Sequence, residues 1–151
     1  MSITKKGQPQ LAGILDFDVT NLKVAKESQV VLGNVAEIID KNETFTLALD
    51  FKGSGQQWEN MCNNSKPGSI TEYRVEFYVE GMGRTPDLPE RLLGVATDKL
   101  VPNQFDYSAQ TSVRIDRSGI YDVSAMITIP QWKGILGFAE GLIIAVHPLE
   151  D

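Results

Sequence analysis

The sequence predicts an all-β protein, folded as an antiparallel β-sandwich of about seven to nine strands. Apolar and polar residues alternate with a period of two through most of the 151 residues, as in strands that bury one face and expose the other. Turn-forming sequences rich in Gly, Pro, Asn and Asp separate these stretches at near-regular intervals. Because helical periodicity is weak, a sandwich is favoured, with a small barrel or a jelly roll as the alternative.

Three strands are expected in the first third of the chain. Residues 14–24 and 35–40 form weaker strands, and the second of these ends in the turn sequence Asp-Lys-Asn-Glu. Residues 44–51 alternate most clearly, with four large apolar side chains on one face: Phe45, Leu47, Leu49 and Phe51. The irregular stretch 53–69 follows, and its segment 56–62 is compatible with one helical turn.

The rest of the chain contains five more expected strands. Residues 72–80, 105–116 and 121–129 alternate clearly, and residues 138–148 close the chain. Residues 92–100 are ambiguous, because a spacing of four between apolar residues favours a helix whereas the β-branched residues and the glycine favour a strand. The residues behind these two readings are Leu88, Leu92, Ala96 and Leu100 for the helix, and Gly94, Val95 and Thr97 for the strand. We expect a strand.

A single domain is expected over residues 13–151, with residues 1–12 as a flexible N-terminal arm. The net charge of −6 argues against a nucleic-acid partner, since that affinity depends on clustered Lys and Arg. With Cys62 as the one cysteine, an internal disulfide is impossible. The N-terminus lacks the apolar stretch of a signal peptide, and no run of roughly eighteen apolar residues predicts a membrane span. We therefore expect a cytoplasmic protein, with export inside a larger particle left open.

A short motif at the start of the strand 121–129 narrows the fold. The sequence Asp-Arg-Ser-Gly at 116–119 favours a type I turn, and Tyr121 then opens the inward face of the strand. The spacing Gly119-x-Tyr121-x-Val123 resembles the strand entry of bacterial immunoglobulin-like and fibronectin type III-like domains. The resemblance implies that the Tyr121 ring is buried and that its hydroxyl bonds to backbone a few residues upstream. Val123 stands where antibody-type domains carry a cysteine, so an antibody-type domain is not expected.

No catalytic, cofactor or metal site is predicted. His147, the one histidine, lies at the end of the last strand, and no nucleophile-elbow sequence accompanies it. Cys62 has no neighbouring base that would activate it, so it is interpreted as a buried small residue. Several oxygen ligands lie near one another in sequence, but without the spacing of a calcium loop, and are interpreted as solvated turn residues: Asp16, Asp18, Asp40, Asn42 and Glu43.

The strongest functional signal is an apolar surface near the C-terminus. The expected connection after residues 121–129 carries four large apolar side chains in seven residues: Trp132, Ile135, Leu136 and Phe138. They either cap the end of the sandwich or form an exposed contact patch. Ile143 strengthens the second reading, because in the final strand it points away from Leu142 and Ile144 and gives a possible edge strand a second apolar face.

These observations favour a non-enzymatic protein-interaction or structural module that acts as a homo-oligomer or as a subunit or adaptor of a larger assembly. The alternative is a β-sandwich that binds a carbohydrate or another small molecule, with Trp58 and Tyr78 as stacking platforms. An enzyme ranks last, because few of the usual nucleophiles and bases are present. No cofactor is expected.

Overall fold

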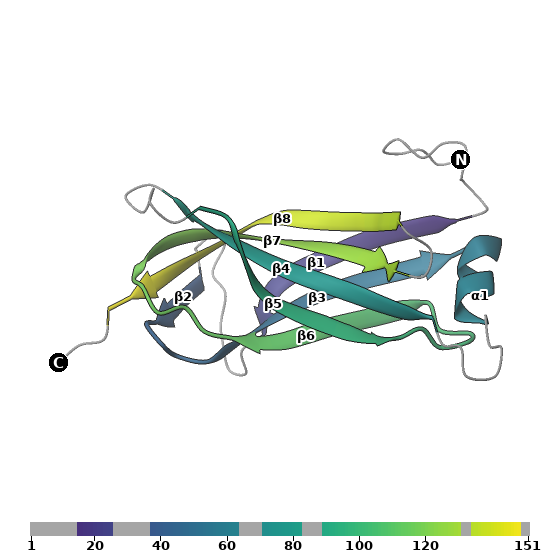
Figure 1. Ribbon diagram of the computed structural model, residues 1–151, viewed down its shortest axis with the longest axis horizontal. Helices are drawn as coiled ribbons and strands as arrows, with labels where there is room; N and C mark the ends of the chain where they lie inside the picture. The colour runs from purple at the N-terminus through teal and green to yellow at the C-terminus, as the bar shows by residue number, and fades with distance from the viewer. Residues whose placement is uncertain (1–14, 26–36, 64–70, 83–88, 131–133, 149–151) are drawn as a thin grey trace.

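The computed structural model describes residues 15–25, 37–63, 71–82, 89–130 and 134–148 (Figure 1). These residues form eight strands and one short helix, in an elongated molecule with the helix at one end and the last residues of β8 at the other. The elements in chain order are β1 (Asp16–Ala25), β2 (Glu37–Asp40), β3 (Phe45–Ser54), α1 (Gln56–Cys62), β4 (Glu72–Met82), β5 (Arg91–Lys99), β6 (Asp106–Val113), β7 (Gly119–Ile129) and β8 (Gly134–His147).

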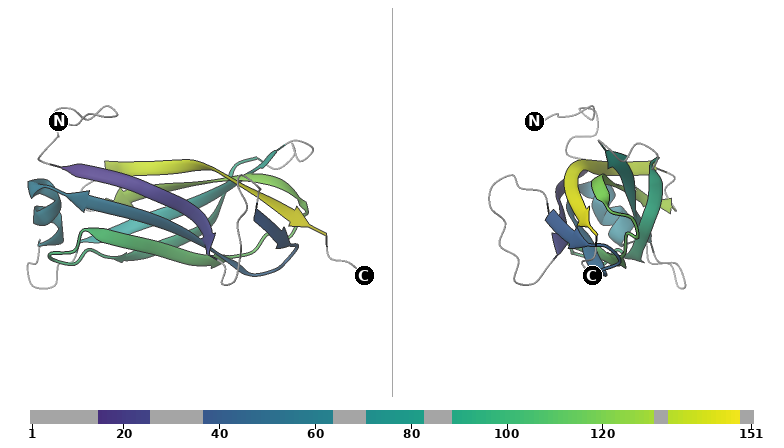
Figure 2. Two further views of the ribbon diagram at one scale, coloured as in Figure 1. Left: turned by 180° about the vertical axis from the view of Figure 1, so that it is seen from behind. Right: turned by 90° about the vertical axis from the view of Figure 1, so that its left-hand side faces the viewer.

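Two sheets face each other across the core, as the end-on view in Figure 2 shows. One sheet has the order β1-β3-β6, and the other has the order β2-β8-β7-β4-β5. β3 and β6 pair as strands B and E of an immunoglobulin-like sandwich do, whereas β4, β7 and β8 are adjacent in the manner of C, F and G. β5 adds to β4 as an extra strand does in variable-type domains. The predicted immunoglobulin-like sandwich is therefore confirmed.

The pairing of β2 with β8 departs from an all-antiparallel sandwich. The two strands run parallel, with Glu37 opposite Ile144 and Asp40 opposite His147. β2 and β3 are separated by a tight turn in which Asn42 has a φ of 67°, yet they belong to different sheets. β2 thus covers the C-terminal end of β8, an edge that would otherwise be bare.

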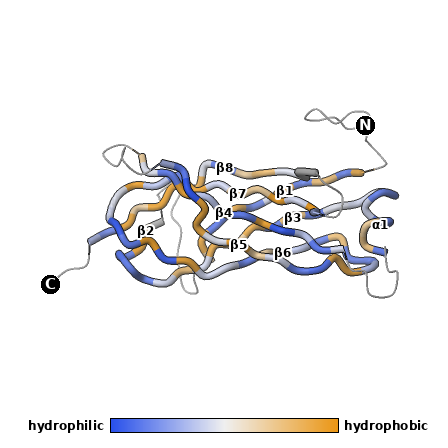
Figure 3. Tube along the Cα trace, in the orientation of Figure 1, coloured by the Kyte–Doolittle hydropathy of each residue, from blue (hydrophilic) through white to orange (hydrophobic). Residues whose placement is uncertain are grey.

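The core lies between the sheets and consists of the inward residues of the alternating strands. In β3, β4 and β7 every second residue is buried, as their sequence pattern predicted, and Figure 3 shows hydrophobic and hydrophilic segments alternating along the strands. The ambiguous segment is strand β5, which confirms the expected strand. A helix there is excluded because β5 pairs with β4 from Lys99, opposite Glu72, to Arg91, opposite Val79.

The motif at Tyr121 folds as the resemblance implied. The Tyr121 ring is fully buried and its hydroxyl donates a 2.7 Å hydrogen bond to the carbonyl oxygen of Arg117, four residues upstream. Gly119 has a φ of 151°, which side-chain-bearing residues rarely adopt, so the turn requires its glycine. Burial raises the pKa of the Tyr121 phenol. Val123 is also fully buried.

The opposite end of the sandwich is closed by α1 and a group of aromatic rings. Trp58, expected in a loop, lies in this helix with its ring fully buried and its Nε1 donating to the carbonyl of Gln104 at 3.2 Å. The ring occupies the space above Gly53, where an added Cβ would come within 2.3 Å of it. The rings in contact at this end, here called the aromatic cluster, are Phe17, Phe51, Trp58, Tyr73 and Tyr107.

Tyr107 anchors the aromatic cluster through its hydroxyl group. Its ring stacks on Phe51 with centroids 5.3 Å apart and planes 6° apart. The hydroxyl oxygen accepts a 2.9 Å hydrogen bond from the backbone N–H of Val101, and the hydroxyl donates to the Val101 carbonyl at 3.3 Å. Burial, the largest cause, raises the pKa of Tyr107 well above its ordinary value.

Candidate functional site

The apolar segment near the C-terminus is mostly strand, not surface connection. β8 begins at Gly134, which lies opposite Ile129 of β7, so residues 134–138 continue the sheet. The expectation of a connection up to Phe138 was wrong because β7 and β8 pair along almost their whole length, from Gly119 opposite Val146 to Ile129 opposite Gly134. Trp132 lies outside the described residues, and for Ile135 and Leu136 only the backbone is described.

Phe138 and Ile143 lie on the same face of β8, the outer face of the five-stranded sheet. Residues five apart in a regular strand point to opposite faces. Here Ala139 and Leu142 both pack against the core, and the pairing with β7 gains one extra residue in β8 between them. That bulge contains Gly141 with a φ of 92°. Phe138 and Ile143 consequently both face outward, opposite Met126 and Asp122 of β7.

Exposure differs between these two residues. Phe138 is 63% exposed, whereas Ile143 is half-buried. Covering a phenyl ring that is this exposed removes its apolar surface from water, which favours binding of another molecule. Of the predicted contact residues whose side chains are described, Phe138 is therefore the one best placed to meet a partner.

The same outer face carries an apolar row that the sequence analysis did not single out. The register places Ile38 of β2 beside Ala145 of β8, Ala145 beside Ile120 of β7, and Ile120 beside Met82 of β4. Three of these side chains are substantially exposed, at 52% for Ile38, 42% for Ile120 and 38% for Met82. We call Ile38, Ala145, Ile120 and Met82 the Ile120 row. Alternation along each strand can predict that these residues point outward. Which of them lie side by side depends on the register of the strands.

Two carboxylates border the Ile120 row. Asp122 of β7 lies opposite Ile143 of β8 on one side and opposite Glu80 of β4 on the other. One of its oxygens, Oδ1, is buried and has no hydrogen-bond partner among the described residues. A buried carboxylate oxygen without a donor is unfavourable by about 1–3 kcal/mol or more. Asp122 thus brings an incompletely paired carboxylate to this face.

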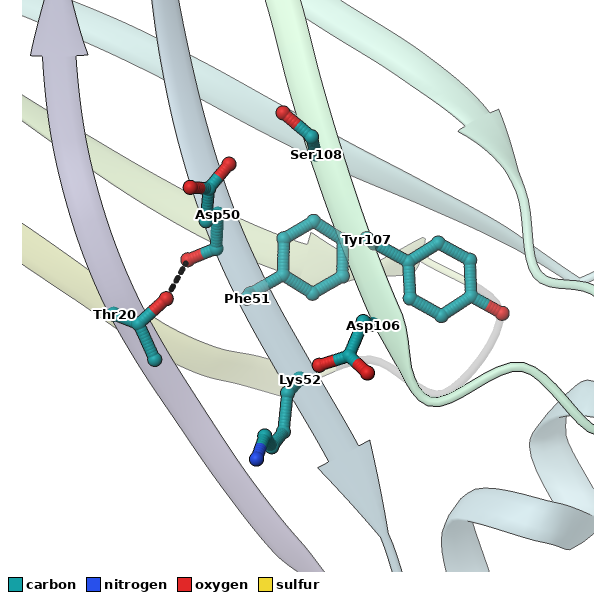
Figure 4. Close-up of a pocket in the computed structure, with 7 residues that line it drawn as sticks. All are labelled: Thr20, Asp50, Phe51, Lys52, Asp106, Tyr107 and Ser108. Carbon is teal, nitrogen blue, oxygen red and sulfur yellow. Dashed lines mark hydrogen bonds between the residues drawn. The ribbon is translucent and has the colours of Figure 1, made fainter.

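The outer face of the other sheet is polar and holds a shallow hollow (Figure 4). Asp50, one of the lining residues, forms an ion pair with Lys23 at 3.1 Å, and its backbone carbonyl accepts a hydrogen bond from the Thr20 hydroxyl at 3.2 Å. Burial acts to raise the pKa of Asp50, but hydrogen bonds from Lys23, Ser108 and Asn21 outweigh it and hold the pKa below its usual range. The carboxylate is thus already engaged by the protein.

The residues considered for catalysis or metal binding are not brought together. Cys62 is buried, burial raises the pKa of its thiol, and its sulfur lies 3.8 Å from the Tyr107 hydroxyl. His147 is exposed at the end of β8, and Glu43 accepts the backbone N–H of Asp40 within its turn. Among the described residues, no three His, Cys, Asp or Glu side chains form a group that could hold a metal ion.

The two expected stacking platforms are separated in the structure. Trp58 is 0% exposed, so the expectation of a surface ring is wrong: α1 folds its indole against the sandwich end. Tyr78 is half-buried on the outer face of β4, where its hydroxyl donates to Glu76 at 2.8 Å. The other Glu76 oxygen accepts from Arg74 at 2.8 Å, and the hydrogen bond from Tyr78, ahead of that from Arg74, lowers the pKa of Glu76.

Comparison with known proteins supports the fold. No family model matches the chain, and no curated protein matches it. Among solved structures, a CARDB domain from Pyrococcus furiosus in complex with di-metal ions is 15% identical, with a TM-score of 0.52, covering 91% of this chain and 97% of that one. A solution NMR structure of a CARDB domain from the same organism is 14% identical, with a TM-score of 0.49, covering 89% and 96%.

A more distant match is the Pseudomonas fluorescens alkylpurine DNA glycosylase bound to DNA containing an abasic site analog. It is 12% identical, with a TM-score of 0.46, and the match covers 91% of this chain and 32% of that enzyme. Within the described residues, no helix is long and apolar enough to cross a membrane. The likeness to the first CARDB domain is one of fold, and this chain has the immunoglobulin-like β-sandwich fold.

Proposed function

We propose that this chain is a non-enzymatic β-sandwich module that works by protein contact, as a homo-oligomer or as a subunit or adaptor of a larger assembly. The observation that carries the proposal is the exposure of Phe138, a residue that is 63% exposed on the outer face of β8. Aromatic side chains, Phe among them, are enriched at the core of protein interfaces. Trp132, Ile135 and Leu136, close by in the sequence, and Ile143 on the same face belong to the proposed contact.

Chemistry elsewhere in the described residues supports a contact function over an enzymatic one. The buried Cys62 thiol has a raised pKa, which disfavours the reactive thiolate. The Asp50 carboxylate in the hollow is bonded by Lys23 and neighbouring side chains. The alternative of a small molecule stacked on Trp58 and Tyr78 is disfavoured, because the Trp58 ring is buried in the core and cannot contact a ligand.

The test compares Phe138→Ser with the matched control Phe105→Ser. Phe105 is 43% exposed and precedes β6, away from β8. We expect Phe138→Ser to weaken self-association, or capture of the native assembly partner, at least tenfold, and Phe105→Ser to leave both unchanged. Light scattering over a concentration series measures the first, and quantitative pull-down from the source cells measures the second. A monomer at high concentration whose partner capture survives both Phe138→Ser and Trp132→Ser contradicts the proposal.

A further inference from the structure

The outer face of the five-stranded sheet combines apolar and acidic side chains in a fixed order. The Ile120 row crosses four strands, β2, β8, β7 and β4, without a charged residue. The adjacent row contains Ile143, Asp122 and Glu80, in which Asp122 and Glu80 face each other across β7 and β4. The two charged residues in these rows, Asp122 and Glu80, are therefore both acidic.

Two like charges directly opposite each other on a sheet repel, and nothing in their own rows compensates them. The buried Oδ1 of Asp122 adds to this, since none of the described residues donates a hydrogen bond to it. A cationic side chain placed over Asp122 and Glu80 would offset the repulsion between the two carboxylates. The same molecule would cover the exposed Ile120 and Met82 side chains beside it.

We propose that this face docks a protein segment in which apolar side chains are interspersed with lysine or arginine. The apolar side chains cover the Ile120 row, and a cationic side chain reaches Asp122 and Glu80. The inference rests on the proposed contact function and specifies its partner. A second copy of this chain is the less favoured occupant, because a two-fold axis passing near Asp122 and Glu80 would bring these acids of both copies together.

The probe for the test is a synthetic, end-blocked peptide of alternating leucine and lysine. Two peptides of the same length serve as comparisons: alternating leucine and glutamate, which keeps the apolar side chains, and alternating serine and lysine, which keeps the charge. Fluorescence anisotropy of labelled peptides measures affinity, and amide chemical shifts locate the binding surface. We expect the leucine–lysine peptide to bind at least tenfold more tightly than either comparison peptide, with shifts on β2, β4, β7 and β8.

Matched variants separate this face from general attraction to an acidic protein. Ile120→Ser and Asp122→Asn are each expected to weaken the leucine–lysine peptide about fivefold to tenfold, in line with the loss of one interface side chain. The controls are Phe105→Ser, an exposed apolar residue elsewhere, and Asp106→Asn, an exposed acid on the other sheet. Both are expected to leave binding unchanged, and thermal melting verifies that every variant is folded.

Several outcomes overturn the inference. These are equal binding of the leucine–glutamate peptide, equal weakening by Asp106→Asn, shifts spread over both sheets, and no binding at all. If the protein is a dimer and Ile120→Ser makes it monomeric, the face binds a second copy of the chain, and the proposal of a cationic partner is wrong. Failure here combined with a loss of assembly in Phe138→Ser leaves the contact function standing, whereas failure of both tests removes both.

Discussion

The two ends of the sandwich are closed by the same device, used in different settings. At one end Tyr121 buries its ring and bonds its hydroxyl to Arg117, four residues upstream. At the α1 end Tyr107 does the same with Val101, six residues upstream, but through both the N–H and the carbonyl. Tyr121 acts within one turn and strand, whereas Tyr107 sits among four other rings contributed by β1, β3, α1 and β4.

The difference shows that one end of a core can be closed by local contacts and the other by contacts between residues far apart in the sequence. A single tyrosine suffices where a tight turn brings the chain back over its own ring. At the α1 end the closure is long-range, since the Nε1 of Trp58 donates to the Gln104 carbonyl, 46 residues away in the sequence. Stability at that end consequently depends on more side chains than at the Tyr121 end.

Removal of the Trp58 ring is expected to have the largest effect. Trp58→Ala leaves a cavity in the aromatic cluster, and we expect a loss of about 3–5 kcal/mol in the free energy of unfolding. Trp58→Phe keeps an aromatic ring but removes the Nε1 hydrogen bond, so it is expected to lose less. Urea denaturation followed by circular dichroism measures both. If Trp58→Ala loses no more stability than Tyr121→Phe, the two ends do not differ as described.

The hydroxyl groups of the two tyrosines provide a finer comparison. Tyr107→Phe removes a donor and an acceptor and leaves the Val101 N–H without its partner, so we expect a loss of about 1–3 kcal/mol. Tyr121→Phe removes one bond to the carbonyl of Arg117, an exposed residue, and is expected to lose about 1 kcal/mol. Urea denaturation of the two variants under identical conditions checks the order. Equal losses would mean that the second bond of Tyr107 contributes nothing.

The smallest effect, and the one that depends on pH, concerns ionisation of the same phenols. Burial raises the pKa of both Tyr107 and Tyr121 in the folded protein, while an unfolded tyrosine ionises near pH 10. The unfolded state therefore loses these two protons first, and the stability that the two phenols contribute is expected to be constant below about pH 10 and to be lost above it. Tyr107→Phe should reduce this slope more than Tyr121→Phe. Denaturation curves across the alkaline range test it, and a slope that neither variant changes contradicts it.

The sequence predicted the Tyr121 end because its signal is local. The turn at 116–119, the glycine and the tyrosine lie within six residues, so one motif specifies both the ring and its hydrogen bond. Inward faces were equally predictable, because alternation identifies them strand by strand. The aromatic cluster was missed since its members come from five elements, and Trp58 stood in a stretch too short to predict a helix with assurance.

The candidate contact was predictable only in part, for a related reason. Alternation identifies outward residues, but the neighbours of Ile120 across the sheet are 25 and 38 residues away in the sequence at Ala145 and Met82. The sequence also placed Phe138 in a connection, because the pairing of β7 with β8 is irregular just before it: the register shifts between Ile127, opposite Gly137, and Thr128, opposite Ile135. Register and bulges are set by the assembled sheet, not by any one strand.

The bulge at Gly141 makes the first part of β8 sensitive to insertions and deletions. Loss of one residue there would restore a regular period while β2 and Tyr121 hold the end of the strand in place. Phe138 would then rotate toward the core, onto the side where Gly137 now leaves room for Phe17 and Val19. A related chain that lacks this residue would present a different surface on the same scaffold. One glycine thus sets which side chains of this strand are available for recognition.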